Sequence, residues 1–208
     1  GWMDGWMVSA QGLNLSTGTI PNADGGYDED DTRATVLVRG SQWLFEDCDI
    51  RCGGGSVFRI HNGRSKELQA AAGDAVSAID WDSEDGDLLR MPDLKGYVNA
   101  VRCGMGGEDP DRFKRVTHFD HADGGLGGGV PKAHSCVDLF EEGGCELSQC
   151  TMTDCDAAIA RCLDASKLAL DRCYCAFSLS GVIAVDRAEV SMVDSVVEYM
   201  WLGAGVRL

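Results

Sequence analysis

A repeat of 22 to 23 residues is the feature that most limits the folds open to this chain. The segments that begin at 145, 168 and 190 share one pattern: apolar, any, apolar, any, any, small Cys or Ser, any, apolar. Alternation at every second residue predicts short strands with one face inward, and the two-residue interruption suits a corner. A helix does not fit, because the apolar spacing follows no 3.6-residue stripe. A unit of this length that repeats is typical of stacked coils, in which each coil completes the strand hydrogen bonds of its neighbour.

Stacking in this register predicts two inward ladders. One contains Leu147, Leu170 and Met192, and the other contains Cys150, Cys173 and Ser195. Each copy is followed after a short gap by a second apolar segment, and an earlier copy spans 43–60. A β-sandwich is the alternative, but it needs hairpin turns, and Asn-Gly and Asp-Gly pairs are missing after residue 145.

At these residues the sequence resembles the right-handed, pectin-lyase-like parallel β-helix repeat, including the β-helix modules attached to F-box and other scaffold proteins. The corner position is often Asn in that group, whereas here it is Cys or Ser. The resemblance covers 145–208 well and 43–60 in part. It implies an all-β, right-handed parallel β-helix solenoid that forms one domain over 1–208, most regular over 145–208. It does not specify an activity.

Residues 62–130 fit the repeat poorly, and we expect irregular coils or an insertion there. The Ala-rich segment 68–79 predicts one short helix. Segments 97–103 and 113–116 have the pattern of strands in irregular coils, and Gly-rich stretches connect them.

Charge and cysteine content limit the partners. The chain has 18 Lys and Arg against 34 Asp and Glu, a net charge of −16, which repels nucleic acid and anionic lipid in the absence of a basic cluster. No apolar run reaches the roughly 20 residues that a membrane-spanning helix needs. The ten cysteines include no CxxC pair. Because several fall at repeat positions, we expect buried, reduced thiols and a soluble protein of a reducing compartment, cytoplasmic or organellar.

Four charged residues are the candidates for catalysis. Sugar-active members of the resembled fold use carboxylates on one outward face to hold Ca²⁺ or to act as general acid and base. Here Asp47, Asp171, Arg172 and Asp194 lie at outward or corner positions. Asp47 aligns with Arg172 and not with Asp171, so no carboxylate pair recurs in adjacent coils. This arrangement favours solvated surface charge over catalysis.

The best metal-like cluster contains His118 and His121, with His134 as a third ligand for Zn²⁺ or Fe. The local sequence is that of a polar loop, and this is the favoured interpretation. The acidic segment 80–87 does not meet the EF-hand spacing, and 124–129 matches no phosphate-binding pattern. No cofactor is therefore expected.

The leading functional hypothesis is a non-catalytic β-helix scaffold that offers a rigid, acidic surface to other proteins in a larger assembly. A carbohydrate-active or carbohydrate-binding β-helix is the alternative. The sequence also predicts that Val206 belongs to a core layer with no layer beyond it, next to other apolar residues. Such surfaces usually bind a partner. The predicted partner-binding residues are Met200, Trp201, Leu202, Val206 and Leu208.

Overall fold

The computed structural model describes residues 7–17, 34–53, 55–61, 95–107 and 133–207. All regular structure in these segments is β-strand, and all pairs of strands are parallel. The predicted helix over 68–79 and the predicted strand over 113–116 lie outside the described residues. The described segments contain no helix with the length and apolarity that crossing a bilayer requires.

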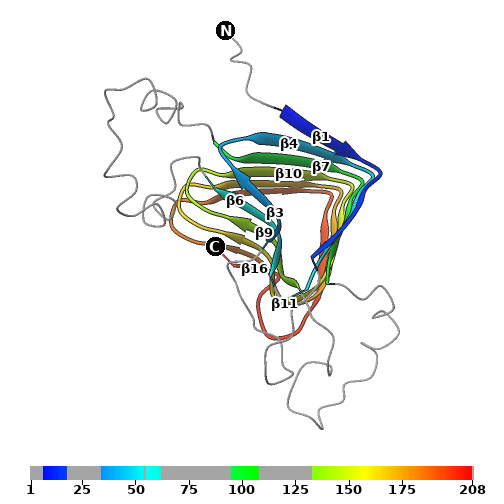
Figure 1. Ribbon diagram of the computed structural model, residues 1–208. Coiled ribbons are helices and arrows are strands. Elements are labelled where there is room, and N and C mark those ends of the chain that lie inside the picture. The colour runs from blue at the N-terminus through cyan, green and yellow to red at the C-terminus, as the bar shows by residue number, and fades with distance from the viewer. Residues whose placement is uncertain (1–6, 18–33, 54, 62–94, 108–132, 208) are drawn as a thin grey trace, which may run out of the picture.

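The strands form three parallel ladders around one core, and Figure 1 shows their three-sided cross-section. The first ladder comprises β1 (Met7–Gln11), β4 (Gln42–Glu46), β7 (Tyr97–Val101), β10 (Gly144–Ser148), β12 (Lys167–Asp171) and β14 (Glu189–Val193). The second comprises β2 (Asn14–Thr17), β5 (Asp49–Cys52), β8 (Gly104–Gly106), the first halves of β11 (Thr151–Cys162) and β13 (Tyr174–Ala184), and β15 (Val196–Met200). The third comprises β3 (Ala34–Arg39), β6 (Ser56–His61), β9 (Ala133–Leu139), the second halves of β11 and β13, and β16 (Val206–Arg207).

Each passage through the three ladders makes one layer, and the described residues contain six layers. Layers 1 to 3 consist of β1 to β3, β4 to β6 and β7 to β9, and layer 6 consists of β14 to β16. In layers 4 and 5, β11 and β13 each run through the second and third ladders without ending. A register irregularity between Cys155 and Ala158 marks the place where β11 passes from one ladder to the next.

The strand register confirms the predicted inward ladder, since Leu147 pairs with Leu170 and Leu170 pairs with Met192. The exclusively parallel pairing rules out the β-sandwich alternative for the described residues, because consecutive strands would then form hairpins. Segment 97–101 was expected in an irregular coil. It instead pairs without a shift with β4 on one side and β10 on the other.

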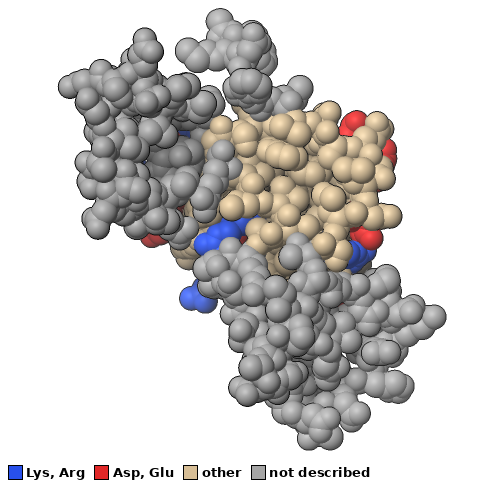
Figure 2. All heavy atoms as spheres, viewed as in Figure 1, with Lys and Arg blue, Asp and Glu red and all other residues tan. Residues whose placement is uncertain are grey.

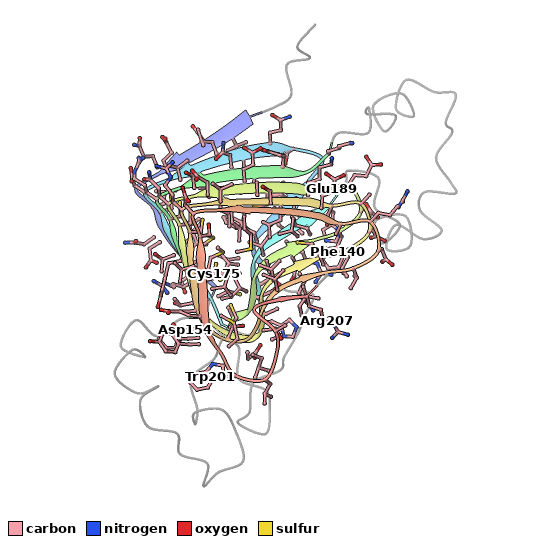
Figure 3. All side chains as sticks on the ribbon, turned by 180° about the vertical axis from the view of Figure 1, so that it is seen from behind. Phe140, Asp154, Cys175, Glu189, Trp201 and Arg207 are labelled. Carbon is pink, nitrogen blue, oxygen red and sulfur yellow. The ribbon has the colours of Figure 1, made fainter. Side chains whose placement is uncertain are left out.

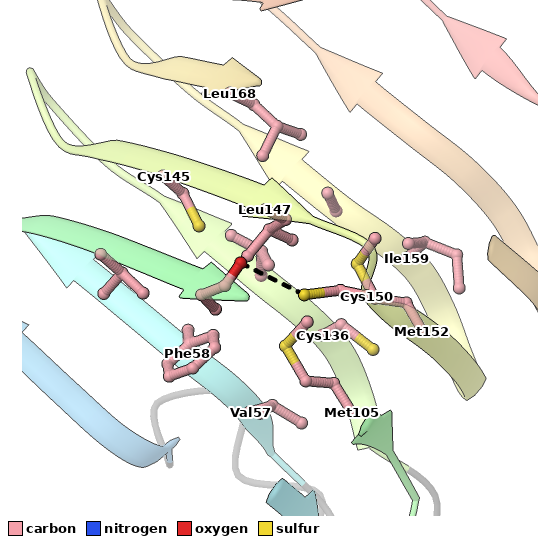
Figure 4. Packing of buried hydrophobic residues seen from close by; sticks show 14 of the residues in the cluster. Val57, Phe58, Met105, Cys136, Cys145, Leu147, Cys150, Met152, Ile159 and Leu168 are labelled. Atoms are coloured by element: carbon pink, nitrogen blue, oxygen red, sulfur yellow. Dashed lines mark hydrogen bonds between the residues drawn. The ribbon is translucent and has the colours of Figure 1, made fainter. Parts of the chain in front are cut away.

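The interior is filled by one apolar cluster to which all three ladders contribute. Side chains alternate along β12, where Leu168 and Leu170 are buried and Asp171 is partly exposed, as the period-2 pattern predicts. Figure 4 shows how side chains from different layers interlock, among them Phe58, Leu147 and Met152. Close packing of this kind gives the stack a fixed cross-section.

A column of residues in the left-handed region forms the corner between the first and second ladders. Its members have φ between 48° and 63°, and they are Gly12, Asp47, Arg102, Gln149, Arg172 and Asp194. The amide of each of the first five donates to a carbonyl of the next layer at 2.9 to 3.0 Å. The corner therefore continues the hydrogen bonding between layers while it turns the chain.

Candidate functional site

The carboxylates predicted as catalytic candidates do not form a site with one another. Asp47, Arg172 and Asp194 lie in the corner column in layers 2, 5 and 6, and Asp171 precedes Arg172. Asp47 accepts two hydrogen bonds from Arg102, at 2.6 and 2.9 Å. Asp171 accepts two from Arg172, at 3.0 and 2.7 Å. Each of these two carboxylates is paired with a cation.

This pairing lowers the pKa values of both carboxyl groups. Hydrogen bonds from Arg102 hold the pKa of Asp47 below its usual value. The Arg172 hydrogen bond does the same for Asp171. A general acid needs a raised pKa, so two exposed carboxylates with lowered pKa values offer no acid and base pair.

Of the three predicted metal ligands, only His134 lies in the described segments. His134 lies on β9, with Nδ1 3.3 Å from Oδ1 of Asp156 on β11. That oxygen accepts no hydrogen bond within the described segments. His118 and His121 lie outside the described residues. Where the structure describes the chain, no three His, Cys, Asp or Glu side chains are grouped as metal ligands.

A column of thiols lines the inside of the corner. Cys150 and Cys173 are buried, as predicted, and Cys48 and Cys103 extend their column toward the N-terminus. Each thiol donates to a carbonyl of the preceding layer: Cys150 bonds to Ala100 at 3.3 Å (the dashed line in Figure 4). Ser195 takes the same place in layer 6, where its hydroxyl accepts the Cys173 amide at 3.0 Å. The thiols of this column thus form hydrogen bonds between successive layers.

All ten cysteines are buried and free of disulfides. Hydrogen bonding to Cys103 and Cys173, together with burial, raises the pKa of Cys150. Burial raises the pKa of Cys162 and of Cys175 to about 12. Cys136 and Cys155 lie with their sulfurs 3.4 Å apart across two layers, a contact that the repeat did not predict. Because a thiol reacts as its thiolate, burial and a raised pKa indicate packing rather than chemistry at Cys150, Cys162 and Cys175.

A buried ionic cluster on the outward side of the third ladder was not predicted. Asp138 on β9 is fully buried, and Arg161 on β11 donates to its two oxygens at 2.7 and 2.5 Å. Ser135 donates to Oδ1 at 2.5 Å, and Ser56 on β6 donates to Oδ2. The four side chains come from layers 2, 3 and 4, so the cluster ties three layers together.

The electrostatics of this cluster are those of a satisfied ion pair. Burial raises the pKa of Asp138, but the hydrogen bonds and charge of Arg161, with the two serines, outweigh burial and hold the pKa below its usual value. A fully buried carboxylate with four donors is neither accessible to a substrate nor basic. The cluster is therefore structural.

Five large apolar side chains of layer 6 are exposed. These exceed 40% exposure, and we call them the C-terminal patch: Val193, Val196, Tyr199, Leu202 and Val206. Figure 3, which shows the molecule from behind, places residues of this layer on each side of the stack, among them Glu189, Trp201 and Arg207. Within the described part of the chain, β14, β15 and β16 each pair only with the strand of layer 5.

The predicted partner-binding residues divide into three groups. Leu202, 85% exposed, and Val206 belong to the patch, while Met200 and Trp201 are half-buried. Leu208 lies outside the described residues. Val206 pairs with the fully buried Val182, as expected for a core column. Val193 and Val196 were not predicted as partner-binding residues, although the repeat places both at positions whose side chains point outward.

No known protein family, curated protein or solved structure matches this chain. The functional assignment consequently depends on the surface and on the site geometry.

Proposed function

We propose that the chain is a right-handed parallel β-helix that serves as a non-catalytic protein-interaction module in a larger assembly. The main support is the pair of exposed valines that layer 6 carries in two outward columns beside the corner. In one, the earlier layers carry Asn14, Asp49, Gly104, Thr151 and Tyr174, and layer 6 carries Val196. In the other, they carry Gln11, Glu46, Val101, Ser148 and Asp171, and layer 6 carries Val193.

The exposure of Val193 and Val196 does not result from the end of the core at layer 6, because both side chains point away from the core. Val193 is 52% exposed and Val196 is 48% exposed. At these two positions layer 6 therefore leaves aliphatic surface in contact with water. Contiguous exposed apolar groups with a polar surround are typical of protein-binding surfaces.

The distribution of charge also favours binding over catalysis. Figure 2 shows mostly uncharged atoms over the described strands on one face, with Asp and Glu atoms near its margin. The predicted acidic surface is thus not a single patch on that face. The candidate carboxylates Asp47 and Asp171 are neutralised by arginines, which leaves no pair for acid and base catalysis.

A photo-cross-linking side chain placed at Val196 tests the proposal in extracts of the source cells. Thr151 is the matched control, because it is exposed in the same column two layers away. We expect a polypeptide adduct from position 196, lost in the Val193→Asp variant, and none from position 151. Equal adducts from both positions would count against the patch.

The carbohydrate alternative has a direct assay. Release of reducing ends or unsaturated uronates from a polysaccharide panel by the purified chain would overturn the non-catalytic assignment. The expected result is no release above a heat-inactivated control.

A further inference from the structure

Two buried cysteines, one in layer 3 and one in layer 4, lie with their sulfur atoms in contact. The Sγ atoms of Cys136 on β9 and Cys155 on β11 are 3.4 Å apart. Both residues belong to the apolar cluster, in which Figure 4 labels Cys136. A disulfide has an S–S length of about 2.0 Å, so these sulfurs need to approach by about 1.4 Å to bond. The fold thus holds the pair near bonding distance.

This contact is separate from the column of thiols at the corner. In the column, each thiol donates to a backbone carbonyl of the preceding layer. Cys136 and Cys155 instead form a hydrogen bond with one another. The column repeats Cys in four layers, whereas Cys155 aligns with Ala133 in layer 3 and with Ser178 in layer 5. The pair is therefore a local feature of two layers and does not follow from the repeat.

An irregularity in β11 accounts for the contact. Between Cys155 and Ala158 β11 advances by three residues, while β9 advances by two, from Ala133 to Ser135. An extra residue of this kind bends a strand and redirects its side chains. It lies where β11 passes from the second ladder to the third, and there it brings Cys155 against Cys136 rather than only against its register partner.

Reaction of the pair requires local opening. Cys136 and Cys155 are 0% and 2% exposed. Burial raises the pKa of Cys155 well above its usual value, so the closed state holds little of the thiolate that thiol exchange needs. The side chains of His134 and Asp156, one or two residues away along each strand, are 24% exposed. Opening at the start of β9 therefore gives a short route from solvent to both sulfurs.

We propose that Cys136 and Cys155 form a reversible disulfide that fastens layer 3 to layer 4, with low-molecular-weight disulfides as the class of oxidant. One protein thiolate attacks the small disulfide, which gives a mixed disulfide and one released thiol. The other protein thiolate then displaces the second small thiol, and the bond between β9 and β11 forms. The two cysteines lose two electrons and two protons, and the small disulfide gains both as two thiols. This proposal is independent of the protein-binding function.

A titration with glutathione tests the proposal. The purified, reduced chain is equilibrated in oxygen-free buffers of rising oxidised-to-reduced ratio, quenched in acid and alkylated, and its intact mass counts the free thiols. The expected result is a single step from ten alkylated cysteines to eight, reversed by excess reduced glutathione. Cleavage after Lys, Arg and Glu should then recover peptides 133–141 and 147–161 joined by a disulfide.

Single variants identify the sulfurs involved. Cys136→Ser and Cys155→Ser should each keep nine alkylated cysteines in every buffer. Cys150→Ser is the matched control, because Cys150 lies on the same peptide as Cys155, and it should still lose two. The thermal midpoint of the natural chain should rise by about 5–10 °C on oxidation, as closure of a loop of this length implies, and that of Cys136→Ser should not change.

Far-UV circular dichroism shows whether each sample is folded, and a serine variant that does not fold is replaced by the alanine variant. Four results would overturn the proposal. They are ten alkylated cysteines in the most oxidising buffer, a loss of two that persists in Cys136→Ser, a loss that begins only after unfolding, and a stable mixed disulfide with glutathione. The last result would mean that the second sulfur does not reach the first.

Discussion

At the scale of single residues, the direction of a side chain decides its energetic role. Leu170 and Asp171 are neighbours on β12, yet one is buried in the core and the other forms a surface pair with Arg172. Leu170 has strands of layers 4 and 6 on its two sides, so little can move to fill a cavity there.

Leu170→Ala should lower the free energy of unfolding by about 2–5 kcal/mol, because it removes buried methyl groups from the centre of the stack. Asp171→Ala should change it by no more than about 0.5 kcal/mol, because an exposed ion pair contributes little. Urea unfolding of both variants measures the difference, and equal costs would contradict the assignment of inward and outward faces.

The Asp138 cluster should make stability depend on pH. Because the pKa of Asp138 is lower in the folded protein than its unfolded value of about 3.9, its contribution is present above that pH. It is lost as the pH falls through the folded-state value. Asp138→Asn should lower the free energy of unfolding by about 3–5 kcal/mol near neutral pH, since it breaks a buried ion pair with Arg161 and weakens the charge-assisted hydrogen bonds that Asp138 accepts.

Chemical denaturation as a function of pH provides the measurement. The stability difference between the natural chain and Asp138→Asn should shrink below about pH 4. Asp171→Asn serves as the exposed control and should show a much smaller difference throughout. A constant difference down to pH 2 would mean that the carboxylate does not hold its low pKa.

At the scale of elements, close backbone contact between layers limits the third ladder. Gly181 on β13 faces the backbone just before β16, and a Cβ at Gly181 would lie 1.9 Å from the carbonyl oxygen of Gly205. The same oxygen accepts the amide of Val182 at 2.9 Å. The approach of β16 to β13 thus requires glycine at this position.

Gly181→Ala should displace β16 and destabilise the protein by about 1–3 kcal/mol, as overpacking does. Gly12→Asn is the matched control: it lies in the corner column with no atom within 4 Å, and its φ of 63° is one that Asn tolerates. It should change stability by no more than about 0.5 kcal/mol. Thermal unfolding of both variants tests this, and a tolerated Gly181→Ala would argue against the observed pairing of β13 with β16.

The elements that could be predicted from sequence are those with a local signal. The period-2 pattern and the Cys or Ser at the corner placed Leu147, Leu170 and Cys173 correctly, because each depends only on its own strand. The Asp138 cluster could not be predicted, since it joins side chains from three layers and no spacing rule links them. The contact between Cys136 and Cys155 was not predicted. It depends on the register irregularity of β11 between Cys155 and Ala158, and no local sequence pattern indicates that irregularity.

At the scale of the whole molecule, protection from solvent varies along the stack. Inward residues of β12 are buried, whereas the corresponding residues of β14, Val190 and Met192, are only half-buried. Opening of layer 6 exposes less apolar surface than opening of layer 4 or 5, so it should require less free energy.

Hydrogen exchange followed by mass spectrometry should therefore show faster exchange in β14 and β15 than in β10 and β12. Samples below the dissociation constant of any dimer are required, because association would protect layer 6. Uniform protection across all six described layers would show that the stack opens only as a unit.

The register of strands that are far apart in the sequence has a consequence for how the repeat can be recognised. β6 ends at His61 and β7 begins at Tyr97, yet β7 pairs with β4 without a shift; β9 likewise resumes beside β6 after β8 ends at Gly106. The position of a strand in the stack therefore does not depend on the number of residues that separate it from the preceding strand. A search for a fixed repeat length would therefore miss β7 and β9, whereas their registers with β4 and β6 identify their places in the stack.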